Sequence, residues 1–350
     1  MKIRFLDVGC GDCIHIFFTD KEGQKRNILI DGGTEEGDVY ERTLKRTLTS
    51  IVEQGEHIDL WIITHIDDDH IGGILRLLKD EELCKIVDFS RMQFWYNYSN
   101  WDYDTGIRPD NLKSVGQAMR LRDFLLENSR VNEMITDQSE VVDFFGARIT
   151  ILSPNHQSFS RLMTKWKMEE TKIRQKDSSS LKMAKKNDYS ITIEDFDVNQ
   201  YRSDSSVENA SSIAFLLEYN GERILMTGDS HPNKVAARII DLWNGEKLSL
   251  QYMQIPHHGS KSNTSKKLLQ SVECNDFIIS GDAYNTNNLP NKETMVKYIK
   301  AFPGRDITFH ITAKNPLTEN IFKVDKPQRV NLEFPKGNDY YLEFELGCKI

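Results

Sequence analysis

The sequence predicts an α/β (α+β) fold, a four-layer αββα sandwich in which two mixed β-sheets pack face to face between outer helices. Two observations predict it. Each half of the 350-residue chain repeats the order strand, polar turn, helix, and in each half polar residues suited to chemistry directly follow an apolar strand. A sheet with two apolar faces needs another layer on each side, so the repeated order indicates two such units packed together.

The first third of the chain alternates strands with helices. Helical spacing of apolar residues over 38–54 predicts a helix, and Leu60-Trp61-Ile62-Ile63 is typical of a fully buried strand. A further helix is predicted from Ile71 to Leu78. The polar segment 65–70 therefore lies on a loop at a strand end, where functional residues often lie. The runs before residue 38 predict a meander of three strands, at residues 2–8, 12–18 and 27–31.

The second half repeats this order around two more polar turns. Strands are predicted over 212–219 and 223–226, followed by the turn 227–230 and a helix that carries Val235 to Ile240. A strand over 250–255 ends at Pro256-His257-His258-Gly259-Ser260, and Phe277-Ile278-Ile279-Ser280 forms another strand. The polar turns of both halves are thus expected at strand ends.

The middle of the chain departs from this order. The aromatic span from Phe94 to Tyr103 is interpreted as a hydrophobic cover of the sheet, with base stacking as the alternative. Residues 156–206 are interpreted as a basic insertion, in which a helical stretch gives way to a linker at 176–180. The predicted division is a main domain over 1–305 with this insertion, followed by a C-terminal β-strand extension over 306–350.

Bulk composition narrows the class of protein. Hydrophobic residues make up 39% of the chain and charged residues 28%, as in folded soluble proteins. No apolar run is long enough for a membrane span, and the N-terminus lacks a signal-peptide core, so we expect a cytoplasmic protein with no membrane partner. Five scattered cysteines argue against a disulfide framework. Cys10 and Cys13 lack the second pair of a zinc ribbon and are interpreted as structural thiols on a turn.

The segment His65-Ile66-Asp67-Asp68-Asp69-His70 carries the strongest chemical signal. Three consecutive carboxylates raise one another's pKa, whereas a bound divalent cation reverses that penalty. Aspartates at a helix N-terminus offer an ordinary explanation, which we accept for Asp68 alone. For the whole set, flanked by histidines after a buried strand, we predict metal binding.

This segment, followed by Ile71-Gly72-Gly73, resembles the metal motif of the metallo-β-lactamase superfamily. The commoner form has histidine where Asp67 stands, and aspartate there is typical of the branch that resembles the hydrolase domain of the DNA-uptake protein ComEC. Other segments agree with that branch in the same order along the chain: Phe5-Leu6-Asp7-Val8-Gly9-x-Gly11-Asp12, Leu29-Ile30-Asp31-Gly32-Gly33, Leu225-Met226-Thr227-Gly228-Asp229 and the turn 256–260. The resemblance implies a stand-alone metallo-β-lactamase sandwich without membrane segments.

The resemblance also implies roles for individual residues. His65 and Asp67 would bind a first ion, Asp69 and His70 a second, and Asp229 would bridge the two. One histidine of the next pair would complete the second site: His258 is preferred, and His257 stays open. Asp69 and His70 are the predicted catalytic residues, Asp69 because it would both bind the metal and orient the attacking water. Asp31 would hold the metal loop in place.

One departure from the family concerns the first ion. The family's usual third histidine, on the strand before the bridging aspartate, has no counterpart, and the matching stretch 207–212 contains Asn209 instead. Asn209 is assigned as a weak ligand or substrate contact, with a plain strand-entry turn as the alternative. Zinc is the expected metal, and the many carboxylates make manganese the competing candidate.

Two cations would activate a bridging water and stabilise charge on a phosphoryl or carbonyl oxygen. Phosphodiesters, including DNA or RNA, are the preferred substrates, since a two-metal clamp suits displacement at phosphorus. The net charge of −8 does not favour a nucleic-acid partner for the molecule as a whole. Residues 160–186, however, hold nine Lys or Arg against three acids, and could hold a polyanion or form a solvated helix face. Ser260 and Lys261 are predicted substrate contacts.

Two other classes of function remain open at this point. One is a hydrolase of small-molecule lactones, thioesters, β-lactams or phosphocholine-like esters, of which the branch motifs disfavour β-lactams. The other is a metal-binding defence component whose activity depends on a protein partner. The metal motif alone does not separate these from a phosphodiesterase, and the sequence does not give the oligomeric state.

Overall fold

The computed structural model describes residues 1–98, 115–173, 187–199, 201–285 and 287–347. The predicted linker 176–180, the basic residues between 174 and 186, and Trp101 and Tyr103 lie outside these ranges. Every helix within them is too short or too polar to cross a bilayer.

Two mixed sheets form the centre of the molecule. In the described residues the first sheet has seven strands, in spatial order β17 (Tyr341–Glu345), β1 (Lys2–Leu6), β2 (Ile14–Thr19), β3 (Lys25–Ile30), β4 (Leu60–Ile63), β5 (Gln93–Tyr96) and β6 (Arg130–Asn132). The second, within the same ranges, has eight, in order β16 (Val330–Glu333), β15 (Ile307–Ile311), β14 (Asp276–Ile279), β12 (Tyr252–Gln254), β10 (Glu222–Met226), β9 (Ala214–Tyr219), β8 (Ala147–Ser153) and β7 (Val142–Phe144). Two short strands, β11 (Leu248–Ser249) and β13 (Val272–Glu273), pair separately.

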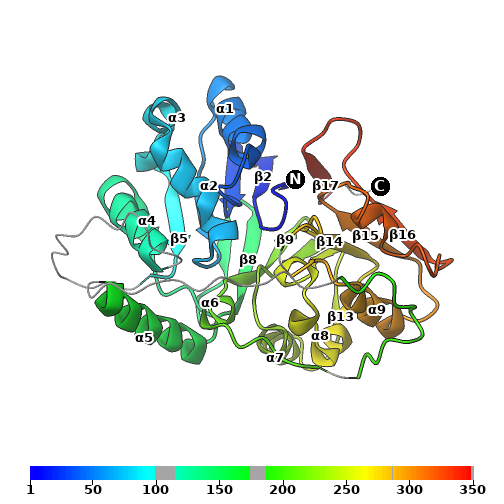
Figure 1. Cartoon of the computed structure of the whole chain (residues 1–350). Coiled ribbons are helices and arrows are strands. Elements are labelled where there is room, and N and C mark those ends of the chain that lie inside the picture. The colour runs from blue at the N-terminus through cyan, green and yellow to red at the C-terminus, as the bar shows by residue number, and fades with distance from the viewer. Residues whose placement is uncertain (99–114, 174–186, 200, 286, 348–350) are drawn as a thin grey trace.

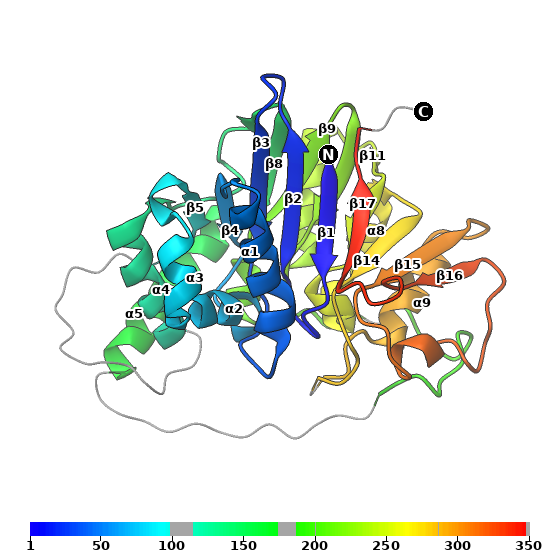
Figure 2. The same ribbon diagram turned by 90° about the horizontal axis from the view of Figure 1, so that it is seen from above.

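Helices cover the outer face of each sheet (Figures 1 and 2). The first sheet carries the π-helical turn η1 (Glu41–Lys45), α1 (Arg46–Glu53), α2 (Asp68–Lys79), α3 (Glu81–Ile86), η2 (Phe89–Arg91), α4 (Val115–Asn128) and α5 (His156–Ile173). The second carries α7 (Pro232–Leu242), α8 (Lys266–Ser271) and α9 (Lys292–Ala301). Short turns complete the list: α6 (Val207–Ala210), η3 (His257–Gly259), η4 (Lys261–Asn263) and η5 (Thr318–Asn320).

Three apolar clusters hold these layers together. One lies between the first sheet and its helices and includes Trp61 and Leu44. Another lies between the second sheet and its helices and includes Phe277. The third joins the inner faces of the two sheets and includes Ile28 and Phe215. Helix, sheet, sheet and helix therefore stack in four layers, and the predicted αββα sandwich is confirmed.

Polar loops gather where strands of both sheets end. β4 is one example: it is buried along its whole length, and residues 64–70 leave the sheet directly after it. The loops after β3, β4, β10 and β12 meet at this place with the loop between β1 and β2. This arrangement brings together residues that lie up to about 250 positions apart in the sequence.

Candidate metal centre

The segment between β4 and α2 supplies four of the predicted ligands. His65 and His70 are buried, whereas Asp67 and Asp69 are partly exposed. Asp67 occupies the N-cap position of α2, but its side chain makes no capping hydrogen bond. Its Oδ2 lies 3.8 Å from His65 Nε2 instead. Asp68 differs, because its carboxylate accepts a hydrogen bond from Gln117 Nε2 at 2.6 Å on α4.

Asp31, directly after β3, fixes the orientation of His70. Its Oδ2 accepts hydrogen bonds from His70 Nδ1 at 2.7 Å and from Thr64 Oγ1 at 2.6 Å, and its Oδ1 accepts from the Thr64 backbone N–H at 2.7 Å. A neutral His70 that donates its Nδ1 proton to Asp31 keeps a lone pair on Nε2. A carboxylate behind a histidine is the usual support of a metal ligand.

Asp229 lies at the centre of the site, on the loop after β10. Its Oδ1 is 3.5 Å from His70 Nε2 and 3.4 Å from His258 Nε2. Its Oδ2 is 3.7 Å from His65 Nε2 and 3.5 Å from His257 Nε2. Each oxygen of this one carboxylate therefore faces a different pair of imidazole rings, which is the geometry of a carboxylate that can bridge two cations.

The two consecutive histidines after β12 reach opposite oxygens of Asp229 because of their backbone. His257 and His258 have φ values of 51° and 54°, in the left-handed region that non-glycine residues seldom adopt. Their rings lie at 89° to each other. The His257 N–H donates to the Gly228 carbonyl at 2.9 Å, which ties this turn to the loop that carries Asp229. Such backbone strain is typical of functional sites.

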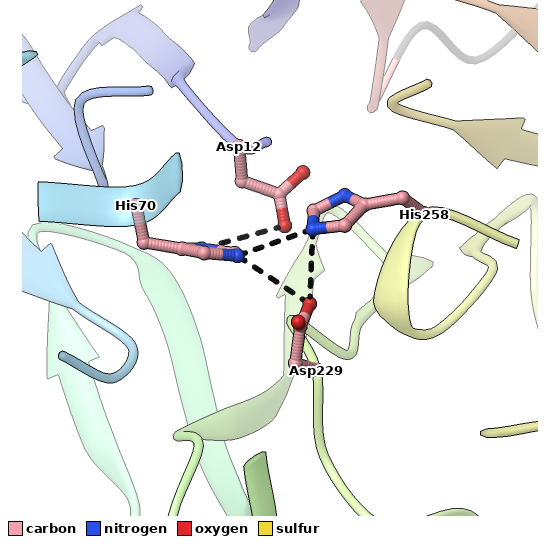
Figure 3. A group of neighbouring side chains, drawn as sticks. All are labelled: Asp12, His70, Asp229 and His258. Carbon is pink, nitrogen blue, oxygen red and sulfur yellow. Dashed lines mark hydrogen bonds and ion pairs between the residues drawn. The ribbon is translucent and has the colours of Figure 1, made fainter. Parts of the chain in front are cut away.

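Asp12 is a member of the cluster that we did not predict from the sequence. Ligand atoms of Asp12, His70, Asp229 and His258 all lie within 4.8 Å of one another, and all four residues are buried (Figure 3). Asp12 Oδ2 accepts a hydrogen bond from Gln254 Nε2 at 2.8 Å. The available signal was its place in the segment Phe5–Asp12, which we had used only to support the resemblance.

Mutual charges shift the pKa values of the site in opposite directions. Burial raises the pKa of Asp67 to about 7, with a contribution from the charge of Asp69. Burial lowers the pKa of His65 to about 3. For His257, burial acts downward, but Asp229 and Asp204 outweigh it and raise the pKa to about 9. Burial likewise opposes ionisation of Asp229, yet the neighbouring histidines hold its pKa well below the ordinary range.

Several buried atoms of the cluster fit a metal better than a hydrogen-bond network. Within the described residues, His65 Nε2, Asp229 Oδ1 and Asp12 Oδ1 have no hydrogen-bond partner. His70 Nε2 and His258 Nε2 lie 3.3 Å apart. Two imidazole nitrogens at this distance can share a proton in a hydrogen bond or converge on one cation. Imidazole and carboxylate donors are the ligands that zinc and manganese accept, so the residues fit the implied metal.

A polar cluster surrounds the outer side of His257. Its Nδ1 lies 3.0 Å from Asn263 Oδ1 and 3.4 Å from Asp204 Oδ2. Donation of the Nδ1 proton to Asn263 leaves Nε2 as the ring atom of His257 that faces Asp229. Asn209, on α6, donates from Nδ2 to Asp204 Oδ2 at 2.6 Å and lies 3.2 Å from His257 Nδ1. Asn209 thus contacts the outer side of His257, and Asp204 is a second participant that sequence reasoning missed.

A polar cavity of about 320 Å³ opens beside His257. Ser260 and Lys261, two of the predicted substrate contacts, line it together with Ser203, Asp204 and Asn291. Lys261 Nζ lies 3.3 Å from a carboxylate oxygen of Glu293. The cavity can hold the part of a substrate that extends beyond the metal ligands.

Comparisons with known proteins agree with the motif. Residues 17–88, which contain His65–His70, match the family model described as the metallo-β-lactamase superfamily. No curated protein matches the chain.

Among solved structures, the chain is similar to a diphosphatase from the PhnP family, at 12% identity and a TM-score of 0.44 over 99% of this chain and 98% of that one. It is also similar to the metallo-β-lactamase fold protein YhfI from Bacillus subtilis, at 10% identity and a TM-score of 0.41 over 98% and 99%. Unliganded yeast PDE1 gives 11% identity and a TM-score of 0.43 over 99% of each chain. These values are too low to carry information about activity.

Proposed function

We propose that this protein, which carries a metallo-β-lactamase superfamily domain, is a metal-dependent hydrolase with two divalent ions and acts on phosphodiesters. One observation carries the proposal: the two oxygens of Asp229 each face two imidazole Nε2 atoms from separate loops. A buried carboxylate with four imidazole neighbours has little structural use. It is well suited to two cations a few ångströms apart.

The ligands divide between the two sides of Asp229. His65, Asp67 and His257 would hold the first ion, and Asp69, His70 and His258 the second. In this assignment His257 supplies the imidazole that the stretch 207–212 lacks. When bound, the ions would lower the pKa of a bound water and stabilise negative charge on the substrate oxygen. Zinc is the preferred metal, with manganese as the alternative.

The chain's own residues would position the attacking water and bind the substrate. Asp69 is partly exposed while His70 behind it is buried, so the Asp69 carboxylate can meet solvent and orient a water. Asp31 keeps His70 in one orientation. Ser260 and Lys261 would hold the non-reacting part of the substrate in the cavity beside His257. Asn209 would act through His257 rather than on the substrate.

Helix α5 supports a polyanionic substrate. Lys165 on α5 forms an ion pair with Glu208, the neighbour of Asn209 on α6. The described part of the basic segment therefore lies next to the metal loops. Exposed Arg161 lines the same groove as Lys165, between α5 and α6. Glu208 and Glu169 offset the charge of Lys165, so it is the charge of Arg161 that would attract the phosphate backbone of DNA or RNA.

The small volume of the cavity beside His257 favours a second candidate, a hydrolase of small-molecule esters, lactones or phosphocholine-type esters. A volume of about 320 Å³ is at the lower end of the range for small-ligand pockets. The two candidates share the metal centre and differ in what lies outside it.

Purified, metal-loaded protein should be assayed against bis-p-nitrophenyl phosphate, single-stranded DNA and nitrocefin. We expect Asp69→Ala to lower turnover of the phosphodiesters by at least about a hundredfold, since it removes a ligand that also orients water. Asp68→Ala is the matched control, because Asp68 bonds to Gln117 instead, and it should retain activity. Turnover of nitrocefin alone would overturn the phosphodiesterase, and silence on all three would favour dependence on a partner.

A further inference from the structure

Cys10 lies on a loop whose backbone contacts the metal-binding segment closely. The loop connects β1 and β2, and the Asp12 N–H donates to the Asp69 carbonyl at 3.3 Å. Gly11, with φ of 148°, approaches so closely that a Cβ there would lie 2.2 Å from the Asp69 carbonyl oxygen. The backbone therefore holds Cys10, the residue before Gly11, beside the ligands assigned to the second ion.

The Cys10 thiol belongs to a group of candidate ligand atoms. Its Sγ, a carboxylate oxygen of Asp69 and a ring nitrogen of His258 all lie within 4.8 Å of one another. Asp69 Oδ2 and His258 Nε2 are 3.3 Å apart. His258 Nε2 in turn lies 3.4 Å from Asp229 Oδ1, a buried oxygen without a hydrogen-bond partner in the described ranges. That unpartnered oxygen indicates a cation next to His258, the ring that also lies near the Cys10 thiol.

We propose that Cys10 supplies a thiolate ligand to the second ion, an inference that rests on the proposed metal centre. The sulfur–metal bond forms as the Sγ–H proton leaves for solvent, with no change in oxidation state. A thiolate is a soft donor, so it selects Zn²⁺ or Co²⁺ over Mn²⁺. Cys10 thus resolves the metal preference that the many carboxylates leave open.

The other described cysteines offer controls. Cys13 and Cys274 are buried, at 1% and 2% exposure, in apolar clusters. Cys84 is partly exposed on α3, outside the loops that form the site. Cys84→Ser therefore removes a partly exposed thiol without touching the metal centre.

Cobalt substitution tests the proposal directly. Protein loaded with Co²⁺ should show the visible bands of bound cobalt and, in the near ultraviolet, a sulfur-to-cobalt charge-transfer band. We expect this second band to disappear in Cys10→Ser and to persist in Cys84→Ser. The role of Cys10 would be overturned if the charge-transfer band were absent from the unmodified protein or unchanged in Cys10→Ser. In either case the visible bands would still show that cobalt is bound at the metal centre. Absence of all cobalt bands would instead overturn the metal centre itself.

Two further measurements remain informative if Cys10→Ser folds poorly. In the unmodified protein, Zn²⁺ should protect Cys10 from alkylation by iodoacetamide, as read by peptide mass mapping, whereas Cys84 should react equally with and without metal. Equal labelling of Cys10 in both states would contradict the proposal. In Cys10→Ser, Zn²⁺ affinity should fall by about tenfold or more, while Mn²⁺ affinity should change much less.

Discussion

At the scale of single residues, the His257–His258 turn places two imidazole rings at the cost of an unfavourable backbone conformation. Each left-handed non-glycine residue costs of order 1–3 kcal/mol. Hydrogen bonds from His257 N–H to the Gly228 carbonyl and from Ser260 N–H to the His257 carbonyl fix the turn. The arrangement is therefore maintained by surrounding backbone contacts, and removal of one ring should leave the turn in place.

This argument predicts the metal content of two variants. His257→Ala and His258→Ala should each bind about one ion fewer per chain, since each ring faces a different oxygen of Asp229 and metal ions need several protein ligands. Elemental analysis after dialysis against limited chelator measures this. His156→Ala, at an exposed position at the start of α5, is the control. Unchanged metal content in His257→Ala would remove His257 from the first site.

His15 on β2 predicts a pH dependence of stability away from the site. Burial lowers its pKa to about 4 from 6.5, although a hydrogen bond with Asn27 at 2.9 Å acts in the opposite direction. The unfolded chain takes up a proton near pH 6.5, and the folded protein does so only near pH 4. Stability from neutral His15 is therefore present above pH 6.5 and is lost as the pH falls from there towards 4.

Between about pH 7.5 and pH 5, this difference amounts to about 2 kcal/mol. Urea unfolding of metal-free protein at the two pH values measures it. His15→Phe keeps a ring stacked on Phe17 but cannot titrate, so its loss of stability over the same range should be smaller by that amount. An equal loss in both proteins would show that His15 does not contribute.

The candidate site was predicted from residues that are neighbours along the chain and from motifs that resemble a known family. His65 to His70 lie in one segment, so their pattern was visible directly. Asp12 and Cys10 could not be assigned in the same way, because their place at the site depends on contact with Asp69 across more than fifty residues. The sequence also left open which of His257 and His258 completes the second site, since two left-handed residues in succession are not expected from local preference.

At the scale of elements, α2 can place its first turn only because it approaches the loop after β3 closely. A Cβ on Gly73 would lie 2.0 Å from the Gly32 carbonyl oxygen. The Gly73 N–H donates to the Gly33 carbonyl at 2.8 Å. Glycine is required here for space, although alanine is the better helix former.

Gly73→Ala should therefore destabilise the protein by about 1–3 kcal/mol and weaken metal binding several-fold, because α2 must move and carries Asp69 and His70 with it. Urea unfolding and metal competition with a chelator measure the two effects. Arg76→Ala, on the exposed side of the same helix, should change neither by much. A fully stable Gly73→Ala protein would show that the contact can relax.

Most elements of the fold followed from the period of apolar residues, and the exceptions have local causes. The strand Leu60–Ile63 has the predicted bounds because every residue in it is buried. The helix predicted over 38–54 is a π-helical turn followed by α1, a difference in hydrogen bonding that side-chain spacing does not record. The stretch before β9 forms the short helix α6, in which Ser206 Oγ accepts from the Asn209 N–H at 3.2 Å, a cap that we had not predicted.

At the scale of the whole molecule, strand β17 contacts both sheets. β17 pairs with β1 along the edge of the first sheet. Phe344 of β17 packs edge-on against Phe5, with ring centroids 5.7 Å apart, and against Tyr252 of the second sheet at 4.9 Å. The C-terminal strands β15 and β16 extend the second sheet next to β14. Residues 306–347 thus contribute to both sheets, and a division at residue 305 stays a prediction.

Phe344→Ala should lower the free energy of unfolding by about 3–5 kcal/mol, because it removes a buried aromatic ring between the sheets. Chemical denaturation followed by circular dichroism measures the change. Tyr284→Ala removes a ring that is 64% exposed and should have little effect. A cost below about 1 kcal/mol for Phe344→Ala would indicate that the C-terminal strands are dispensable for the core.

The pairing of β1 with β17 also affects when the protein can fold during synthesis. Lys2 is the register partner of Glu345, so β1 is synthesised long before the strand that pairs with it. Contacts this distant in sequence close slowly, and an unpaired strand edge exposed in the meantime invites association with other nascent chains. Chaperone demand and expression yield should therefore depend on how soon β17 becomes available to pair with β1.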